Sequence, residues 1–146
     1  NLNYGMTGGQ YSPSTPEASI TSTSREGKAG GSLDLCRLAA NAGANYVARS
    51  TVYHVYEVKK YILQALRTKG FSLVEVLSPC PTYYGRYNKI GDAVAMLEWF
   101  KKKTVPLARF DRMEESEQRE YFWRGVLVQR DNDDFLTRYR QRGVAP

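Results

Sequence analysis

Residues 46–77, YVARSTVYHVYEVKKYILQALRTKGFSLVEVL, contain two strand patterns on either side of a helix pattern. Residues 46–49 have the pattern of a short buried strand, and residues 71–77 form an apolar run of strand length that is rich in β-forming side chains. Between them, apolar residues recur at spacings of three and four, which predicts a helix over about residues 52–69. Its predicted packing stripe is Val55, Val58, Ile62 and Ala65. This order predicts a βαβ unit with parallel strands and a right-handed crossover.

The flanking sequence extends this unit to a larger domain. Further elements are predicted as a helix over residues 33–42 capped by Ser32, a helix over 92–103 that Pro106 ends, a strand over 125–128, and a helix from Asp133 or Asp134 to about Gly143. Residues 107–120 carry no clear period and are predicted to be a connection. The predicted fold class is α/β, with a mostly parallel sheet flanked by helices.

The opening stretch, residues 1–16, is an uncharged loop sequence rich in Gly, Pro, Ser, Thr and Asn. The pair Gly8-Gly9 lets the main chain approach a ligand closely. Hard oxygens suited to Mg²⁺ and phosphate are offered by Asn1, Asn3, Thr7 and Ser12. A polar turn-rich loop without a ligand is the alternative, because such clusters are usually only loops.

A second irregular loop, residues 78–89, follows the strand predicted over 71–77. Ligands bind at the carboxyl ends of strands in open α/β sheets, so this loop is well placed for a site. Within it, Cys80 lies between two prolines, which hold the thiol on a stiff backbone. Its residue type and position alone leave two alternatives, a metal ligand or an ordinary buried thiol.

Three other side chains are candidates for contact with a substrate. His54 is the only histidine and could act as a base, or it could have a structural role at the start of its helix. Arg49 and Arg86 could bind carboxylate or phosphate groups of a ligand, because guanidinium groups form bidentate pairs with such anions. Salt bridges within the protein are the alternative for both arginines.

Composition narrows the function classes. The chain has 146 residues, a net charge of +6 and a pI near 9.4. The basic residues are spread along the sequence and match no usual nucleic-acid-binding motif, so we expect no nucleic-acid partner. No apolar run of about 18 residues exists, so we expect no membrane span. The two cysteines fit a reducing, cytoplasmic setting. Because the chain opens with Asn1 inside a motif, we expect natural sequence before it.

Both loops resemble one family. The motif N-x-NYGMTGGQYSPSTP at residues 1–16 and the motif SPCPTYYGRYNKIGDA at residues 78–93 resemble the β subunit of 2-oxoacid:ferredoxin oxidoreductases, most of all the 2-oxoglutarate type. The resemblance implies that Asn1 gives a side-chain oxygen and Asn3 a backbone carbonyl to Mg²⁺. It also implies that Tyr4, Gly5, Met6 and Thr7 pass beside thiamine diphosphate, and that Cys80 is the fourth thiolate of a [4Fe–4S] cluster.

The implied fold is part of a thiamine-diphosphate-binding fold, with its C-terminal half over residues 1–105 and an extension over 106–146 that holds a connection, a short strand and a basic helix. The implied reaction is oxidative decarboxylation of a 2-oxoacid with coenzyme A and electron transfer to ferredoxin, together with an α subunit. The family's GDG motif and its other three cluster cysteines are absent from this sequence, and some relatives carry Lys at the position of Gly8. A non-redox thiamine enzyme and a basic nucleic-acid-binding module are the alternatives.

Overall fold

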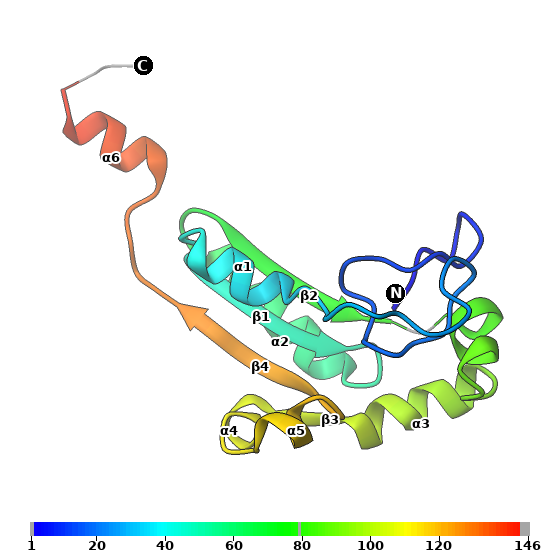
Figure 1. Ribbon diagram of the computed structural model, residues 1–146. Helices are drawn as coiled ribbons and strands as arrows, with labels where there is room; N and C mark the ends of the chain where they lie inside the picture. Colours follow the sequence, from blue (N-terminus) through cyan, green and yellow to red (C-terminus); the bar gives the residue numbers. More distant parts are fainter. Residues whose placement is uncertain (1, 79, 144–146) are drawn as a thin grey trace.

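A four-stranded sheet is the centre of the computed structural model, which describes residues 2–78 and 80–143. Its strands are β1 (Tyr46–Thr51), β2 (Ser72–Leu77), β3 (Thr104–Pro106) and β4 (Phe122–Gln129), in the order β2-β1-β4-β3. The pairs β1–β2 and β3–β4 are parallel, and the pair β1–β4 is antiparallel. The predicted α/β class with a mostly parallel sheet is therefore confirmed (Figure 1).

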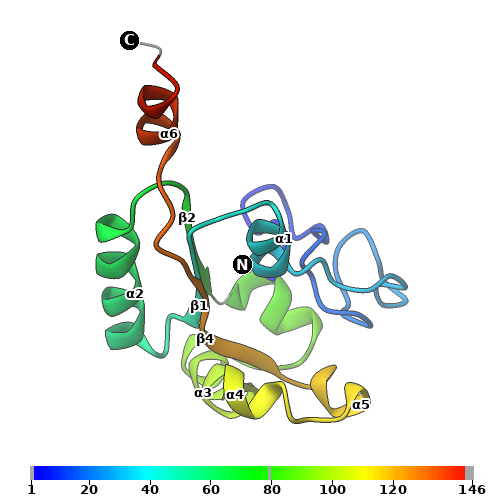
Figure 2. The same ribbon diagram turned by 90° about the vertical axis from the view of Figure 1, so that its left-hand side faces the viewer.

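Helices lie on both faces of this sheet. They are α1 (Leu35–Asn41), α2 (Val55–Arg67), α3 (Ala93–Lys103), α4 (Leu107–Phe110), α5 (Glu115–Gln118) and α6 (Phe135–Gln141), with a π-helical turn η1 (Pro81–Gly85). Figure 2 shows α2 on one side of β1 and β2, and α1 on the other side. None of the helices in the described part of the chain is long and apolar enough to cross a bilayer.

Aspartate side chains begin three of the helices. Asp34, Asp92 and Asp134 each accept a hydrogen bond from the backbone N–H three residues later. Such caps bind N–H groups that have no partner inside the helix. The prediction of Ser32 as the first cap is wrong, because Asp34 takes that place and the Ser32 hydroxyl donates to the carbonyl oxygen of Thr15 instead.

The βαβ unit is confirmed, and the packing face of α2 matches the predicted stripe in part. Tyr61 is the buried residue of this helix and packs with Tyr46 and Ala48 of β1. Of the predicted stripe, Ala65 packs against the same cluster and Val58 is half-buried, whereas Val55 and Ile62 are 58% and 43% exposed. The helix carries apolar side chains on its outer face as well, so periodicity alone could not show which face is inward.

The chain beyond residue 105 adds to the same sheet. The predicted strand over 125–128 is longer in the structure, where β4 lies between β1 and β3. The short strand β3 and the helices α4 and α5 were not predicted. Pro106 ends β3, and it is tolerated there because β3 is at the sheet edge and proline has no N–H to donate. Helix α6 stands beyond the sheet at the end of β4 (Figure 1).

Candidate functional site

The opening loop folds back on itself around a tight turn. The backbone N–H of Tyr4 donates to the carbonyl oxygen of Gln10 at 2.8 Å, and the N–H of Gly9 donates to the carbonyl oxygen of Tyr4 at 2.9 Å. Gly8 and Gly9 have φ angles of +115° and +84°, which side-chain-bearing residues rarely adopt. The turn leaves Tyr4, Met6 and Thr7 exposed at its tip, with Gly5 half-buried.

Beside this turn lies a cavity of about 460 Å³. It is lined by Asn3, Tyr4, Gly5, Met6, Thr7, Ser12, Pro13, Ser14, Leu33 and Leu35. All four residues that were predicted to pass beside thiamine diphosphate, Tyr4, Gly5, Met6 and Thr7, line this cavity together with Asn3. The structure therefore brings these candidates together around one space.

Asn3 differs from the other polar residues of the loop. Its side chain is only 3% exposed, and neither its amide oxygen nor its amide nitrogen has a hydrogen-bond partner in the described part of the chain. A buried polar group without a partner costs about 1–3 kcal/mol. Asn3 lines the adjoining cavity as a residue, and its oxygen atoms are of the kind that suits Mg²⁺, although the two amide atoms themselves are closed off from solvent. Asn1, the other residue predicted to bind Mg²⁺, lies outside the described residues.

A buried lysine holds the loop in this form. The Nζ atom of Lys28 donates to the carbonyl oxygens of Pro13, Thr15 and Gly31 at 3.0, 2.8 and 2.9 Å. Desolvation lowers the pKa of Lys28, although the carboxylate of Glu17 acts in the opposite direction. Sequence analysis missed this residue, because a lysine in a Ser/Gly-rich stretch gives no sign of burial.

The second loop contains regular structure that was not predicted. Cys80 immediately precedes η1, and its carbonyl oxygen accepts a hydrogen bond from the N–H of Gly85 at 3.0 Å. The thiol is half-buried and packs against the hydrophobic cluster that contains Leu2, Leu77 and Met96. Leu2 of the opening loop and Cys80 of the second loop therefore share one cluster.

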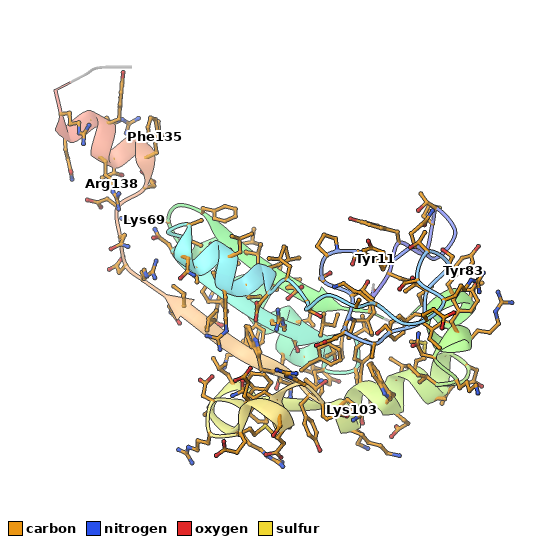
Figure 3. All side chains as sticks on the ribbon, viewed as in Figure 1. Tyr11, Lys69, Tyr83, Lys103, Phe135 and Arg138 are labelled. Atoms are coloured by element: carbon orange, nitrogen blue, oxygen red, sulfur yellow. The ribbon has the colours of Figure 1, made fainter. Side chains whose placement is uncertain are left out.

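Direct contacts join the two loops at several points. The Oγ atom of Ser19 lies 2.8 Å from the phenol oxygen of Tyr84. The side chain of Asn88 accepts from the N–H of Ile20 and donates to its carbonyl oxygen, both at 2.9 Å. Figure 3 shows Tyr11 and Tyr83, one from each loop, at the same end of the molecule, far from Phe135 of α6. The two motifs that suggested a function thus form one continuous surface.

Gly9 is the closest point of that contact. A Cβ atom placed on Gly9 would lie 2.8 Å from Cβ, Cγ and Cδ1 of Tyr83. Real Cβ atoms do not come so close to other carbons, so only glycine lets the two loops meet here. The glycine pair of the opening loop therefore serves packing as well as backbone conformation.

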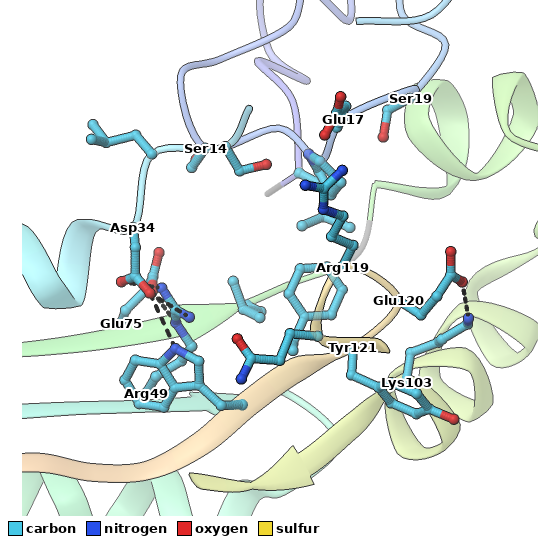
Figure 4. A pocket seen from close by; sticks show the side chains of 18 of the residues that line it. Ser14, Glu17, Ser19, Asp34, Arg49, Glu75, Lys103, Arg119, Glu120 and Tyr121 are labelled. Carbon is cyan, nitrogen blue, oxygen red and sulfur yellow. Dashed lines mark hydrogen bonds and ion pairs between the residues drawn. The ribbon is translucent and has the colours of Figure 1, made fainter. Parts of the chain in front are cut away.

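Arg49 lies in a second, larger cavity of about 760 Å³, between the opening loop and the segment that leads into β4 (Figure 4). Its guanidinium group is already bound by two carboxylates: Nε lies 2.5 Å from Glu75, and Nη2 lies 2.9 Å from Asp34. Burial alone would lower the pKa of Arg49, but the neighbouring carboxylates raise it above its ordinary value. The arginine is 7% exposed and charged, with both of its partners in place.

The sheet register brings this network together. β1 and β2 pair in parallel with Arg49 directly opposite Glu75. Asp34 at the start of α1 also accepts a hydrogen bond from the indole nitrogen of Trp123 at 3.1 Å, and the arginine lies 4.2 Å from the centre of that ring. A lone Glu in an apolar strand needs a partner when it is buried, so the sequence did carry a signal for this pair.

His54 and Arg86 line neither of these two cavities. The Nδ1 atom of His54 lies 2.9 Å from the hydroxyl of Thr51, and burial lowers the pKa of the imidazole, with a further contribution from the charge of Arg124. Arg86 is exposed, and its guanidinium lies 5.6 Å from the centre of the Tyr87 ring. The structure does not group these two residues with the cavity beside Asn3.

Within residues 2–78 and 80–143, no group of three or more His, Cys, Asp or Glu side chains is arranged to hold a metal ion. The second cysteine, Cys36, is fully buried in a different hydrophobic cluster from Cys80. Burial raises the pKa of its thiol, and the carboxylate of Glu75 has the same effect while Arg49 opposes it. Of these two cysteines, Cys80 is therefore the one that is only half-buried.

Comparison with known proteins identifies the family. Residues 1–76 match the family described as thiamine pyrophosphate enzyme, C-terminal TPP binding domain. The chain belongs to this family. Its αβα architecture, with the motif-bearing loops gathered at one end, agrees with that membership.

The relatives define a narrower group within the family. The chain is 41% identical over 114 residues to the 2-oxoglutarate synthase subunit KorB of Methanocaldococcus jannaschii, a match covering 78% of this chain and 42% of that protein. It is 48% identical over 83 residues to the KorB subunit of Archaeoglobus fulgidus, covering 57% of this chain and 31% of that protein. It is also 32% identical over 104 residues to a 2-oxoacid:ferredoxin oxidoreductase subunit beta of Sulfolobus, covering 71% of this chain and 32% of that protein. The resemblance seen in the two motifs is confirmed.

A solved structure shows the same fold. The chain superposes with a TM-score of 0.74 on a 2-oxoglutarate:ferredoxin oxidoreductase from Magnetococcus marinus, at 20% identity and over 97% of this chain and 50% of that chain. That structure holds 2-oxoglutarate, coenzyme A and succinyl-CoA. The present chain spans half or less of the length of these relatives.

Proposed function

We propose that this chain is part of the β subunit of a 2-oxoacid:ferredoxin oxidoreductase. The proposed reaction converts a 2-oxoacid, coenzyme A and oxidised ferredoxin to acyl-CoA, carbon dioxide and reduced ferredoxin. The names of the relatives favour 2-oxoglutarate as the 2-oxoacid. We expect the enzyme to be cytoplasmic. We also expect it to work with an α subunit, because in the family the glutamate that activates the thiamine ring belongs to that subunit.

The observation that carries this proposal is the cavity beside the opening loop. It is lined by Asn3, Tyr4, Gly5, Met6 and Thr7, five consecutive residues of the motif. These residues fit thiamine diphosphate with Mg²⁺, because oxygen donors suit Mg²⁺ and a glycine-containing turn can bring backbone N–H groups to a diphosphate. Asn1 would hold the metal ion with its side-chain oxygen and Asn3 with its backbone carbonyl, and residues 4–7 would lie along the cofactor.

Thiamine diphosphate, when bound, supplies the carbanion chemistry that lets a 2-oxoacid lose carbon dioxide. The protein residues have the simpler task of holding the reacting groups in place. Lys28 and the contact of Gly9 with Tyr83 keep the opening loop in a fixed form before any ligand arrives. A site that is already ordered loses less free energy on binding than one that must fold around its ligand.

Cys80 is the proposed ligand to a [4Fe–4S] cluster that passes electrons to ferredoxin one at a time. The half-buried thiol at the start of η1 fits one thiolate of such a cluster. Three further cysteines are needed, and in the family these lie near the N-terminus of the subunit. Cys36 is not one of them, because it is buried in another cluster and protonated.

Arg86, Arg49 and His54 differ in how free their side chains are to contact a substrate. The exposed Arg86 can reach an anionic group. Arg49 already has two carboxylate partners, so a substrate carboxylate would compete with Glu75 and Asp34 for it. His54 is held by Thr51 and is neutral at physiological pH because its pKa is lowered.

The native assembly, purified without oxygen, tests the reaction directly. Reduction of viologen or ferredoxin should require a 2-oxoacid, coenzyme A and thiamine diphosphate, with 2-oxoglutarate the best of a panel of 2-oxoacids. Decarboxylation without any electron acceptor, in a protein that has no iron–sulfur absorption, would instead indicate a non-redox thiamine enzyme.

Two variant pairs test the residues independently of activity. Asn1→Ala should weaken thiamine diphosphate binding in a Mg²⁺-dependent way, whereas Asn41→Ala, at an exposed position at the end of α1, should leave it unchanged. Cys80→Ser should lower the iron content, whereas Cys36→Ala should retain it. Equal behaviour within either pair would contradict the assigned role.

A further inference from the structure

Two arginines from different loops stack on one tyrosine ring at the exposed edge of the second loop. The guanidinium carbon of Arg25 lies 4.9 Å from the centre of the Tyr87 ring, and that of Arg86 lies 5.6 Å from it. Lys89, two residues further along, is also exposed. We call these four residues, Arg25, Arg86, Tyr87 and Lys89, the arginine–tyrosine surface.

The positive charge of this surface is not neutralised by the chain itself. In the described residues, Arg25, Arg86 and Lys89 have no carboxylate within ion-pair distance. The neighbouring Glu26 is exposed and forms no ion pair with them. The Tyr87 ring fixes the two guanidinium groups by cation–π contact, which leaves their N–H donors available to an external anion.

The surface lies directly beside Cys80. The backbone N–H of Arg86 donates to the carbonyl oxygen of Pro81, the residue that follows Cys80. Gly85, which precedes Arg86, donates to the carbonyl oxygen of Cys80 itself. One turn of backbone therefore carries both the thiol and an arginine of the surface, so a protein that covers the surface also comes close to the thiol.

The shape of the surface favours a protein partner over a small molecule. None of its four residues lines either of the two cavities described above. Small ligands bind in concave sites that enclose most of their area. Exposed charges on an open surface instead speed the approach of an oppositely charged protein and orient it.

We propose that the arginine–tyrosine surface docks an acidic electron-carrier protein, the acceptor of the electrons that leave through the cluster at Cys80. This proposal rests on the proposed function. The contact is of the small, transient kind used by redox partners, which bury less than about 1,200 Å² in total. Its charges act mainly on the rate of association and on the dependence of that rate on salt.

The test uses the native assembly carrying Arg25→Glu and Arg86→Glu together. With ferredoxin as the varied acceptor, kcat/KM at low ionic strength should fall by about tenfold or more, and its dependence on salt should weaken. With methyl viologen, which needs no docking surface, kcat should stay unchanged. The control is Arg109→Glu with Arg112→Glu, which makes the same change of charge at exposed residues near α4.

Three outcomes would overturn the docking proposal: an unchanged kcat/KM for ferredoxin, an equal fall in the control variant, or a raised KM for coenzyme A with ferredoxin kinetics intact. If the wild-type assembly reduces viologen with a 2-oxoacid and the variants give one of these three outcomes, the docking proposal is wrong and the proposed function stands. A wild-type assembly that reduces no acceptor at all contradicts the proposed function itself.

Discussion

Replacing Arg49 by methionine should destabilise the protein more than any exposed substitution. The guanidinium group lies between Glu75 at 2.5 Å and Asp34 at 2.9 Å, and its side chain is 9% exposed. Methionine keeps an unbranched apolar side chain against the Trp123 ring, so most of the packing volume remains. What is lost is the positive charge between two carboxylates.

The size of the effect follows from the burial of those carboxylates. Removing one member of a buried ion pair costs about 3–5 kcal/mol, because the remaining charge is left without a partner. The Glu75 side chain is 14% exposed and cannot regain much water, whereas Asp34 is 29% exposed and still accepts hydrogen bonds from Arg37 and Trp123. We therefore expect a loss of about 3 kcal/mol, near the lower end of that range.

Denaturant unfolding of the purified native protein measures this loss, with Arg112→Met as the exposed control. The double variant Arg49→Met with Glu75→Leu should recover part of the stability, because it removes the unpaired carboxylate. A loss below about 1 kcal/mol would refute the reasoning from burial. A raised KM for the 2-oxoacid without any loss of stability would show instead that Arg49 serves the substrate.

Other predictions concern the loop contact, a histidine and a buried thiol. Gly9→Ala should lower the free energy of opening of the two loops by about 1–3 kcal/mol, because the new Cβ would lie 2.8 Å from Tyr83 and the φ angle is +84°. Amide hydrogen exchange measures this change. Gly30→Ala is the neutral control, because a Cβ there would have nothing within 4 Å. Burial lowers the pKa of His54 below its ordinary value of 6.5 in the folded protein. As the pH drops through about 6.5, the unfolded chain therefore binds a proton at His54 more readily than the folded protein, and the free energy of unfolding should fall. His54→Asn should flatten that slope in unfolding measurements, and an NMR titration with a pKa above 6.5 would contradict it. Cys36, whose thiol pKa is raised by burial, should react with a thiol reagent only after unfolding, and rapid labelling of the native protein would show that its cluster opens.

Much of the fold could be predicted because its signals are local. The strand patterns at residues 46–49 and 71–77 appear as β1 and β2, and the loop length and helix between them require a parallel pair. Asp134, one of the two predicted starts of the last helix, caps α6 through a contact with the N–H three residues later. Such features depend on neighbours in the sequence and not on the rest of the fold.

Features that depend on distant contacts could not be predicted. β3 has only three residues and exists because β4 pairs with it, so its own sequence gives no strand pattern. The inner face of α2 is set by Tyr46 and Ala48 of β1, which pack with Tyr61 and Ala65, so only part of the predicted stripe faces inward. The π-helical turn η1 likewise follows from the bond between Gly85 and Cys80 and from packing against Met96.

The candidate site combines both kinds of information. The motifs identify which residues can bind a cofactor, but only the folded chain shows that Leu2 and Cys80 share a cluster and that Gly9 touches Tyr83. Those contacts explain why a loop with so few regular elements is ordered enough to bury Asn3 without a partner. A buried, unpaired amide is a local loss of stability that the surrounding contacts must offset. The same contacts that hold the loop therefore also hold the residues that line the cavity beside it.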